Sequence, residues 1–273
     1  MNMGVNIKFG GSYSIDMTNY DFDLSNLPSA SISSYNKTTI SGYVGSMKVV
    51  INGSGFTYNE YGVTGGTVTG FSEKYGSELV ASVSGLKISV KTILDLAENG
   101  SLNAVKATVK KALAGGDSIT GSNYHDVLFG YDGNDTLSGN GGADEIHGGN
   151  GNDQIIGGFG SDHLFGEAGK DTFVYKSVGN SNLSAGVDTI FDFSGKLGDR
   201  IDLSAIDANS KTAKNDAFSF IGSKSFSGHA GELRVEKKAS DTYIYGDTNG
   251  DKIADIAIHL DDAVTMSKGY FFL

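Results

Sequence analysis

The sequence has no cysteine and a single proline among its 273 residues, and its absences exclude several kinds of protein. Without cysteine the chain has no disulfide framework, no thiolate metal site and no thiol nucleophile. No run of about 18 or more apolar residues occurs, so no membrane-spanning helix is expected. The first residues, MNMGVNIKFGGSYSID, lack the basic and hydrophobic regions of a cleavable secretory signal.

Basic residues are also few, because 21 lysines and arginines face 32 aspartates and glutamates, for a net charge of -11. Such a surface repels phosphate backbones and attracts cations, so we expect no nucleic-acid partner. The length suits two modest domains. Glycine, by contrast, is abundant at 40 residues, and its distribution is the main lead.

Aspartate recurs every nine residues in the middle of the chain, and an apolar residue follows each aspartate at the second position. The aspartates are Asp117, Asp126, Asp135, Asp144, Asp153, Asp162 and Asp171, and the apolar residues are Ile119, Leu128, Leu137, Ile146, Ile155, Leu164 and Phe173. Glycine follows the first six aspartates at the fourth position. A disordered linker has no reason to keep this register.

Each nine-residue unit predicts a three-residue strand with one inward apolar side chain, followed by a six-residue glycine turn such as GYDGND. Two units then make one coil of a flattened right-handed helix. Turns on the same side stack at about 4.8 Å, the spacing of adjacent strands.

The stacked turns place carboxylates in rows, and Lys170 is the only lysine or arginine between Asp117 and Asp171. The rows therefore need cations. Calcium suits them best, because all candidate ligands are hard oxygens and sharing between turns supplies six to eight of them, about the number that calcium takes. Its binding energy would become folding energy.

The pattern G-G-x-G-x-D resembles the nonapeptide repeat of RTX proteins over about six units. The resemblance implies a parallel β-roll with Ca²⁺ between same-side turns, ligated by closing aspartates and by turn carbonyls such as those of Gly130, Gly139, Gly148 and Gly157. It points to Asp126, Asp135, Asp144, Asp153, Asp162 and Asp171 as ligands, with Asp132, Asn134, Asn150 and Asn152 near the sites. Tyr124 and Phe159 break the pattern, so their turns are expected to bind weakly or act as caps.

Residues 172–273 contain further alternating segments, including DTIFDF, ELRVEKK, DTYIYGD and ADIAIHL, and predict strands that extend the roll into a β-sandwich. The series resembles the C-terminal region of serralysin metalloproteases, which caps the roll in that family. Within it, an acidic loop has the oxygen spacing of many calcium loops but no glutamate at position twelve, so a calcium site and a solvated turn both stay open. The candidate ligands are Asp247, Asn249, Asp251 and Asp255.

The final residues, SKGYFFL, form a short apolar run. Resemblance to RTX proteins implies an uncleaved C-terminal signal that is read by a type I ABC exporter. The alternative is a final β-strand, and one segment can serve as both. We therefore expect a secreted, extracellular protein.

Residues 1–116 predict a small β-rich domain, from runs such as KVVINGSGFTY and ELVASVSGLKISV, ending in a helix capped by Ser101. The helix should cover the first turn of the roll, since an exposed sheet edge would pair with other chains. The expected domains are thus 1–116, the calcium-binding roll at 117–175 and the sandwich with the secretion signal at 176–273.

No HExxH, G-x-S-x-G or phosphate-loop motif occurs, so the sequence offers no evidence of an enzyme. The five histidines do not have the spacing of a zinc cluster, and we expect them to be ordinary surface residues. A binding or surface-interaction module with a cell-surface or other extracellular ligand is the favoured interpretation of residues 1–116. A secreted enzyme with an unrecognised site is one alternative. A hemophore-like binder is another, in which Tyr58 would ligate haem iron.

Overall fold

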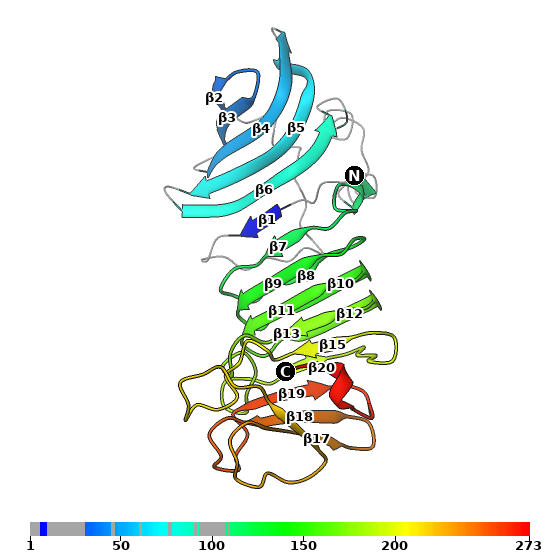
Figure 1. Cartoon of the computed structure of the whole chain (residues 1–273). Coiled ribbons are helices and arrows are strands. Elements are labelled where there is room, and N and C mark those ends of the chain that lie inside the picture. The colour runs from blue at the N-terminus through cyan, green and yellow to red at the C-terminus, as the bar shows by residue number, and fades with distance from the viewer. Residues whose placement is uncertain are drawn as a thin grey trace.

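The computed structural model describes residues 6–9, 31–44, 47–59, 62–75, 78–89, 92, 107–108 and 110–273. Within these ranges the protein is mainly β, as the sequence predicts (Figure 1). The strands up to the end of the repeats are β1 (Asn6–Phe9), β2 (Ser31–Tyr35), β3 (Thr39–Val44), β4 (Met47–Asn59), β5 (Gly62–Tyr75), β6 (Glu78–Ser89), β7 (Ser118–Thr120), β8 (Val127–Phe129), β9 (Thr136–Gly141), β10 (Glu145–Gly151), β11 (Gln154–Phe159), β12 (His163–Gly169) and β13 (Thr172–Val174).

The nine-residue units form a parallel β-roll in which successive strands alternate between two sheets. One sheet contains β7, β9, β11 and β13, and the other contains β8, β10 and β12. Neighbouring strands pair in a register of 18 residues, as in Ile119 with Leu137 and Ile146 with Leu164. The apolar residue of every unit, from Ile119 to Phe173, is fully buried between the sheets. The predicted coil of two units is therefore confirmed.

The C-terminal strands lengthen both sheets of the roll. They are β14 (Asp188–Ile190), β15 (Arg200–Asp202), β16 (Ser219–Gly222), β17 (Glu232–Lys237), β18 (Thr242–Asp247), β19 (Ile256–Leu260) and β20 (Phe271–Phe272). β15 and β20 extend the first sheet, while β14, β19, β18, β17 and β16 extend the second. The pairing changes from parallel to antiparallel at β18 and β19. The predicted sandwich extension is thus present.

The N-terminal strands belong to the same sheet as the roll. Strands β2 to β6 form an antiparallel series, and β1 lies between β6 and β7, antiparallel to one and parallel to the other (Figure 1). One hydrophobic core contains Val83 and Leu86 together with Ile119. Strand pairing and core thus continue across the expected boundary at residue 116, and that boundary stays a prediction.

The predicted capping helix lies partly outside the described residues, among them its proposed cap Ser101. Residues 107–108 and 110–112 are helical, and Leu113 directly after them is buried in the core of the roll. The edge of β7, however, is paired by the strand β1. A strand thus supplies edge protection that the sequence assigned to the helix. No helix among the described residues has the length and hydropathy needed to cross a membrane.

Candidate metal centre

The repeat aspartates form two columns, one along each side of the roll, which we call the carboxylate columns. Within a column, the backbone N–H of each aspartate donates to Oδ1 of the aspartate in the next coil. These N–Oδ1 distances are 2.8 Å for Asp135 to Asp153, 2.9 Å for Asp144 to Asp162 and 2.9 Å for Asp153 to Asp171. Asp126 to Asp171 are at most 2% exposed. One oxygen of each carboxylate therefore holds the coils in register.

Two members of the columns were missed by the sequence analysis. Asp188 accepts the N–H of Asp162 at 3.0 Å, and Asp199 accepts that of Asp171 at 3.0 Å. Their separations from those partners are 26 and 28 residues, because loops interrupt the nine-residue period after β13. The signal was present, since each is followed two residues later by a buried isoleucine, Ile190 or Ile201.

The second oxygen of most column carboxylates is buried without a hydrogen bond. Within the described part of the chain, these oxygens include Oδ2 of Asp135, Asp144, Asp153, Asp162 and Asp171. A buried carboxylate oxygen without a partner is costly, because its hydration has been lost without replacement. The columns thus present a series of oxygens that a cation would satisfy.

A glycine five residues before each aspartate leaves room for these oxygens. A Cβ on Gly148 would lie 2.6 Å from Oδ2 of Asp153 and 2.9 Å from the carbonyl oxygen of Gly166. A carboxylate and a carbonyl oxygen of the next coil thus share one side of the glycine, and we call them the oxygen pair. The same arrangement of carboxylate and carbonyl recurs at Gly130 and Gly139. At Gly157 the nearest atoms all belong to Asp162.

The electrostatics of the columns disfavour bare carboxylates. Burial first, and the charges of the neighbouring column aspartates second, raise the pKa of Asp135 to about 7 and that of Asp144 to about 8. Burial likewise raises the pKa of Asp171 to about 7. The ordinary value is 3.8, so at neutral pH these groups need either a proton or a cation. Hard oxygen ligands that neighbouring turns share suit calcium.

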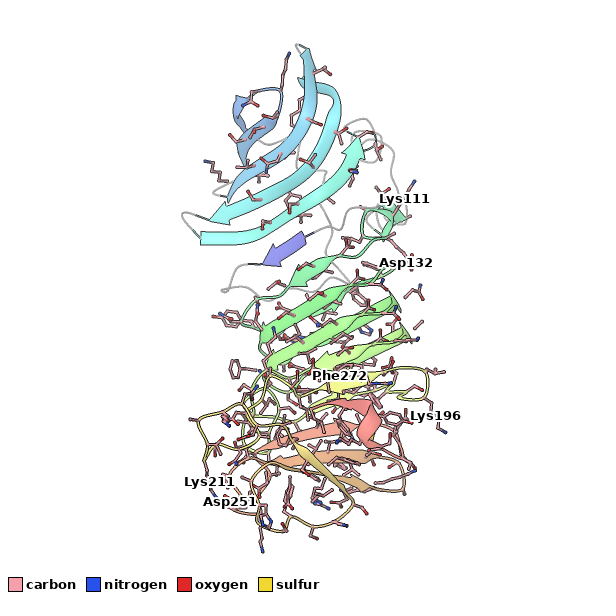
Figure 2. The ribbon with its side chains drawn as sticks, in the orientation of Figure 1. Lys111, Asp132, Lys196, Lys211, Asp251 and Phe272 are labelled. Atoms are coloured by element: carbon pink, nitrogen blue, oxygen red, sulfur yellow. The ribbon has the colours of Figure 1, made fainter. Side chains whose placement is uncertain are left out.

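Asp132, Asn134, Asn150 and Asn152 lie in the outer part of the turns, where Asp132 is labelled in Figure 2. They join coils to each other: Asn150 Nδ2 donates to Asp132 Oδ1 at 2.6 Å, and the Asn152 N–H donates to Asn134 Oδ1 at 2.7 Å. The structure thus brings them beside the columns but gives side-chain oxygens of Asp132, Asn134 and Asn152 protein partners. Their role as ligands stays a prediction.

The first turn, residues 121–126, differs from the later ones. Ser122 donates its N–H to Oδ2 of Asp126 and its hydroxyl to Oδ1 at 3.1 Å, so both carboxylate oxygens have partners. Ser122 and Tyr124 also lack the positive φ found at the matching positions of the next turn, Tyr131 and Gly133. Phe159, the other departure, leaves the backbone of its turn unchanged, since Gly158 and Gly160 keep positive φ and Phe159 is 62% exposed.

The model of the family described as peptidase M10 serralysin C terminal matches residues 59–270. The chain belongs to this family. It is an RTX-like calcium-binding β-roll domain of the kind found in secreted proteins. No curated protein matches the chain.

Two solution structures of subunits of the Azotobacter vinelandii mannuronan C5-epimerase are similar to the chain. AlgE6R2 is 26% identical, with 57% of this chain and 92% of that chain covered, at a TM-score of 0.42. AlgE6R3 is 23% identical, with 56% and 77% covered, at a TM-score of 0.24.

The acidic loop at residues 247–255 of this serralysin C-terminal domain closes on itself. Asp247 is fully buried, and its carboxylate accepts the N–H groups of Asn249, Gly250 and Lys252 at 3.1, 2.6 and 2.9 Å. Asp255 Oδ2 accepts both the N–H and the hydroxyl of Thr248 at 2.7 Å. Asp251 lies in the loops of the sandwich, far from the N-terminal sheet (Figure 2). The four predicted ligands are thus brought into one loop, and a calcium ion there stays a prediction.

The end of the serralysin C-terminal domain is a strand. Residues Lys268–Tyr270 form a single 3₁₀ turn, and β20 then pairs with β15. Phe271 is buried in the core, whereas Phe272 is 48% exposed. The strand alternative for the tail is thus present in the folded protein. A secretion signal in the same residues stays a prediction.

Proposed function

We propose that this chain is an extracellular calcium-binding protein that leaves the cell unfolded through a type I exporter and folds its β-roll when Ca²⁺ binds outside. The observation that carries the proposal is the set of buried Oδ2 atoms without partners in the carboxylate columns. Asp135, Asp144, Asp153, Asp162 and Asp171 would hold calcium together with glycine carbonyls of the turns. The ion would supply charge compensation, and the closing coils would supply the buried apolar core.

The calcium concentrations inside and outside the cell agree with an unfolded chain before export and a folded chain after it. Cytosolic calcium is far below the dissociation constants of extracellular modules, about 10⁻⁴ to 10⁻³ M, so the roll is expected to stay unfolded inside the cell. Like charges at the spacing of adjacent strands then keep the repeats apart. A chain without cysteine also forms no bridge before export.

Calcium titration of the full chain tests the proposal. In chelator, far-ultraviolet circular dichroism should show a largely disordered segment from about residue 117 onward, and added Ca²⁺ should produce β structure. Mg²⁺ at the same concentration should not, because it demands near-octahedral geometry and gives up water reluctantly. Identical spectra with and without calcium would contradict the proposal.

The export step is tested by deleting residues 270–273 in cells that carry a type I exporter. Secretion should be lost, because we propose that the exporter reads this end of the unfolded chain. The truncated chain also lacks β20, so folding is measured separately on purified protein by calcium titration. A truncated chain that reaches the medium at normal levels would show that the tail is a strand alone.

We propose that the strands before the roll form a binding or surface-interaction module. The support is their position, since β2 to β6 extend one sheet of the roll away from the calcium turns. Tyr58 lies in β4, but its side chain lies outside the described residues. A glycan and protein array probed with the full calcium-loaded chain tests the module, with a chain beginning at residue 59 as the comparison. Equal binding by both chains would show that β1 to β4 take no part in it.

A further inference from the structure

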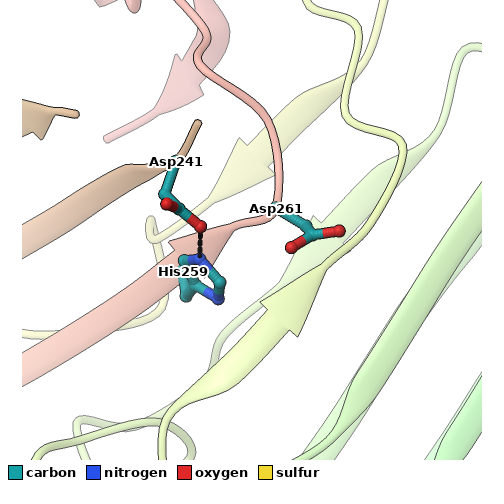
Figure 3. Close-up of side chains that lie close together, drawn as sticks. All are labelled: Asp241, His259 and Asp261. Carbon is teal, nitrogen blue, oxygen red and sulfur yellow. Dashed lines mark hydrogen bonds and ion pairs between the residues drawn. The ribbon is translucent and has the colours of Figure 1, made fainter. Parts of the chain in front are cut away.

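A histidine and two aspartates meet at one end of the pairing between β18 and β19 (Figure 3). Thr242, the first residue of β18, lies opposite Leu260, the last residue of β19. Asp241 and Asp261 flank that pair, and His259 lies one position inside it on β19. One donor atom from each of the three side chains lies within 4.8 Å of the other two. The group is remote in sequence from the repeat aspartates.

The imidazole of His259 is held from two sides. Nδ1 lies 3.1 Å from Oγ1 of Thr189 on β14, and the ring stacks on Tyr243 at 4.7 Å with an interplanar angle of 20°. Nε2 therefore points at Asp241, whose Oδ1 is 2.9 Å away. A metal-binding histidine is commonly fixed in this way, with its second nitrogen bonded to a neighbouring group. The sequence analysis expected no such support, because Thr189 and Tyr243 are distant in the chain.

The charges at this end of the pairing are unbalanced. Two like charges placed across neighbouring strands are destabilising. The carboxylate of Asp241 accepts the hydroxyl of Ser240 and lies 2.9 Å from Nε2 of His259, while Asp261, directly after the neighbouring strand, adds a second carboxylate. Lys238, the nearby cation, lies over the Tyr243 ring at 4.1 Å. An ion between the carboxylates and Nε2 would offset the repulsion.

We propose that Asp241, His259 and Asp261 form a site for one divalent transition-metal ion, represented by Zn²⁺, that is separate from the calcium turns. The donor set is one imidazole nitrogen and two carboxylates, which suits zinc with three protein ligands and a water as the fourth. Calcium prefers six to eight oxygens, about twice what these side chains offer. Asp261 is exposed, so its carboxylate is free to turn toward the other two ligands.

The ion would add a link between two parts of the sandwich that Thr242 already connects, through bonds from its hydroxyl to the carbonyl oxygens of Asp262 and Val264. Asp261 begins the segment that leaves β19 and returns to the roll as β20. Zinc at this position would therefore hold the start of the tail to β18, while Thr189 connects the site to β14.

Zinc titration of the full chain in saturating calcium tests the proposal, because calcium then occupies the turns. Calorimetry should give one zinc equivalent, and Co²⁺ in its place should give visible absorption bands. His259→Gln and Asp261→Asn should each weaken zinc binding by about tenfold or more. Asp262→Asn, an exposed neighbour, should leave the affinity unchanged and serves as the matched control.

Folding is checked for each variant by its calcium-dependent circular dichroism. The side chain of Asp261 is exposed at a strand end, so Asp261→Asn keeps the test valid if His259→Gln fails to fold. Absence of zinc binding by the parent chain would overturn the proposal, as would equal zinc affinity in Asp261→Asn and Asp262→Asn. In either case Asp241 and His259 would form an ion pair only.

Discussion

The aspartates of the roll and the aspartate that opens the 247–255 loop are equally buried but differ in what surrounds them. Asp153 is 2% exposed, and its Oδ1 accepts the N–H of Asp135 while its Oδ2 has no partner. Asp247 is 0% exposed, and its carboxylate accepts three backbone N–H groups. Burial of a carboxylate is therefore a poor sign of a metal site by itself. A buried oxygen without a partner is the better sign.

The comparison predicts different outcomes for one isosteric change in the two regions. Asp153→Asn keeps an acceptor for the Asp135 N–H but removes one charge from the calcium ligands that we propose in the turns on both sides. We expect fewer bound calcium ions and a loss of folding free energy of about 3 kcal/mol or more in calcium. Asp247→Asn should cost about 1–3 kcal/mol through its weakened N–H contacts and leave the number of bound calcium ions unchanged.

Equilibrium dialysis with calcium and urea denaturation in calcium measure these two quantities. A reduced calcium count in Asp247→Asn would break the comparison, since the loop would then hold an ion. An unchanged count in Asp153→Asn would show that the columns are not the calcium sites.

The oxygen pair gives a second way to sharpen the comparison. Gly148→Ala places a Cβ 2.6 Å from Asp153 Oδ2 and 2.9 Å from the Gly166 carbonyl, so one of these oxygens must move. We expect a higher calcium midpoint and a stability loss of about 1–3 kcal/mol. Gly141→Ala is the matched control, since its Cβ would find its nearest neighbour at 3.7 Å. Equal calcium midpoints for the two variants would show that the oxygen pair takes no part in binding.

The roll could be predicted well from the sequence, because equivalent positions of successive repeats lie in the same structural environment. In each nine-residue unit of residues 117–171, the apolar residue marks the strand and the buried core. The aspartate two residues earlier marks the position in the carboxylate column. The prediction stopped where loops changed the spacing, so Asp188 and Asp199 were missed although they continue the columns. The group around His259 was also missed, because its ligands and supports come from three separate segments. Only the pairing of β14, β18 and β19 brings them together.

A change of pH gives a smaller expected effect and tests the buried carboxylate oxygens that have no partner. The folded-state pKa of about 7 at Asp135 and about 8 at Asp144 exceeds the ordinary 3.8, so the calcium-free folded roll binds more protons than the unfolded chain. Its stability should therefore be greatest at low pH and fall as the pH rises from about 4 to about 8. Calcium-free protein should show more β structure near pH 5.5 than near pH 8. Calcium binding near pH 6.5 should release protons, and a titration without proton release would contradict the pKa shifts.

The first turn of the roll allows the smallest test, which is a gain rather than a loss. Ser122 satisfies both oxygens of Asp126, so the comparison predicts that residues 121–126 hold calcium weakly. The double change Ser122→Asn and Tyr124→Gly gives this turn the residues of 139–144 at its second and fourth positions, where Asn140 and Gly142 have positive φ. The change removes the hydroxyl that bonds to Oδ1, and with positive φ at both positions the backbone N–H of residue 122 should turn away from Oδ2 of Asp126, as in the later turns. We expect one more calcium ion per chain and a slightly lower calcium midpoint.

Ser122→Asn alone is the control, because Tyr124 should still oppose the left-handed conformation. If the double variant binds no more calcium than the parent chain, a freed carboxylate oxygen is not enough to make a site, and the contrast with Asp247 must rest on the column neighbours instead.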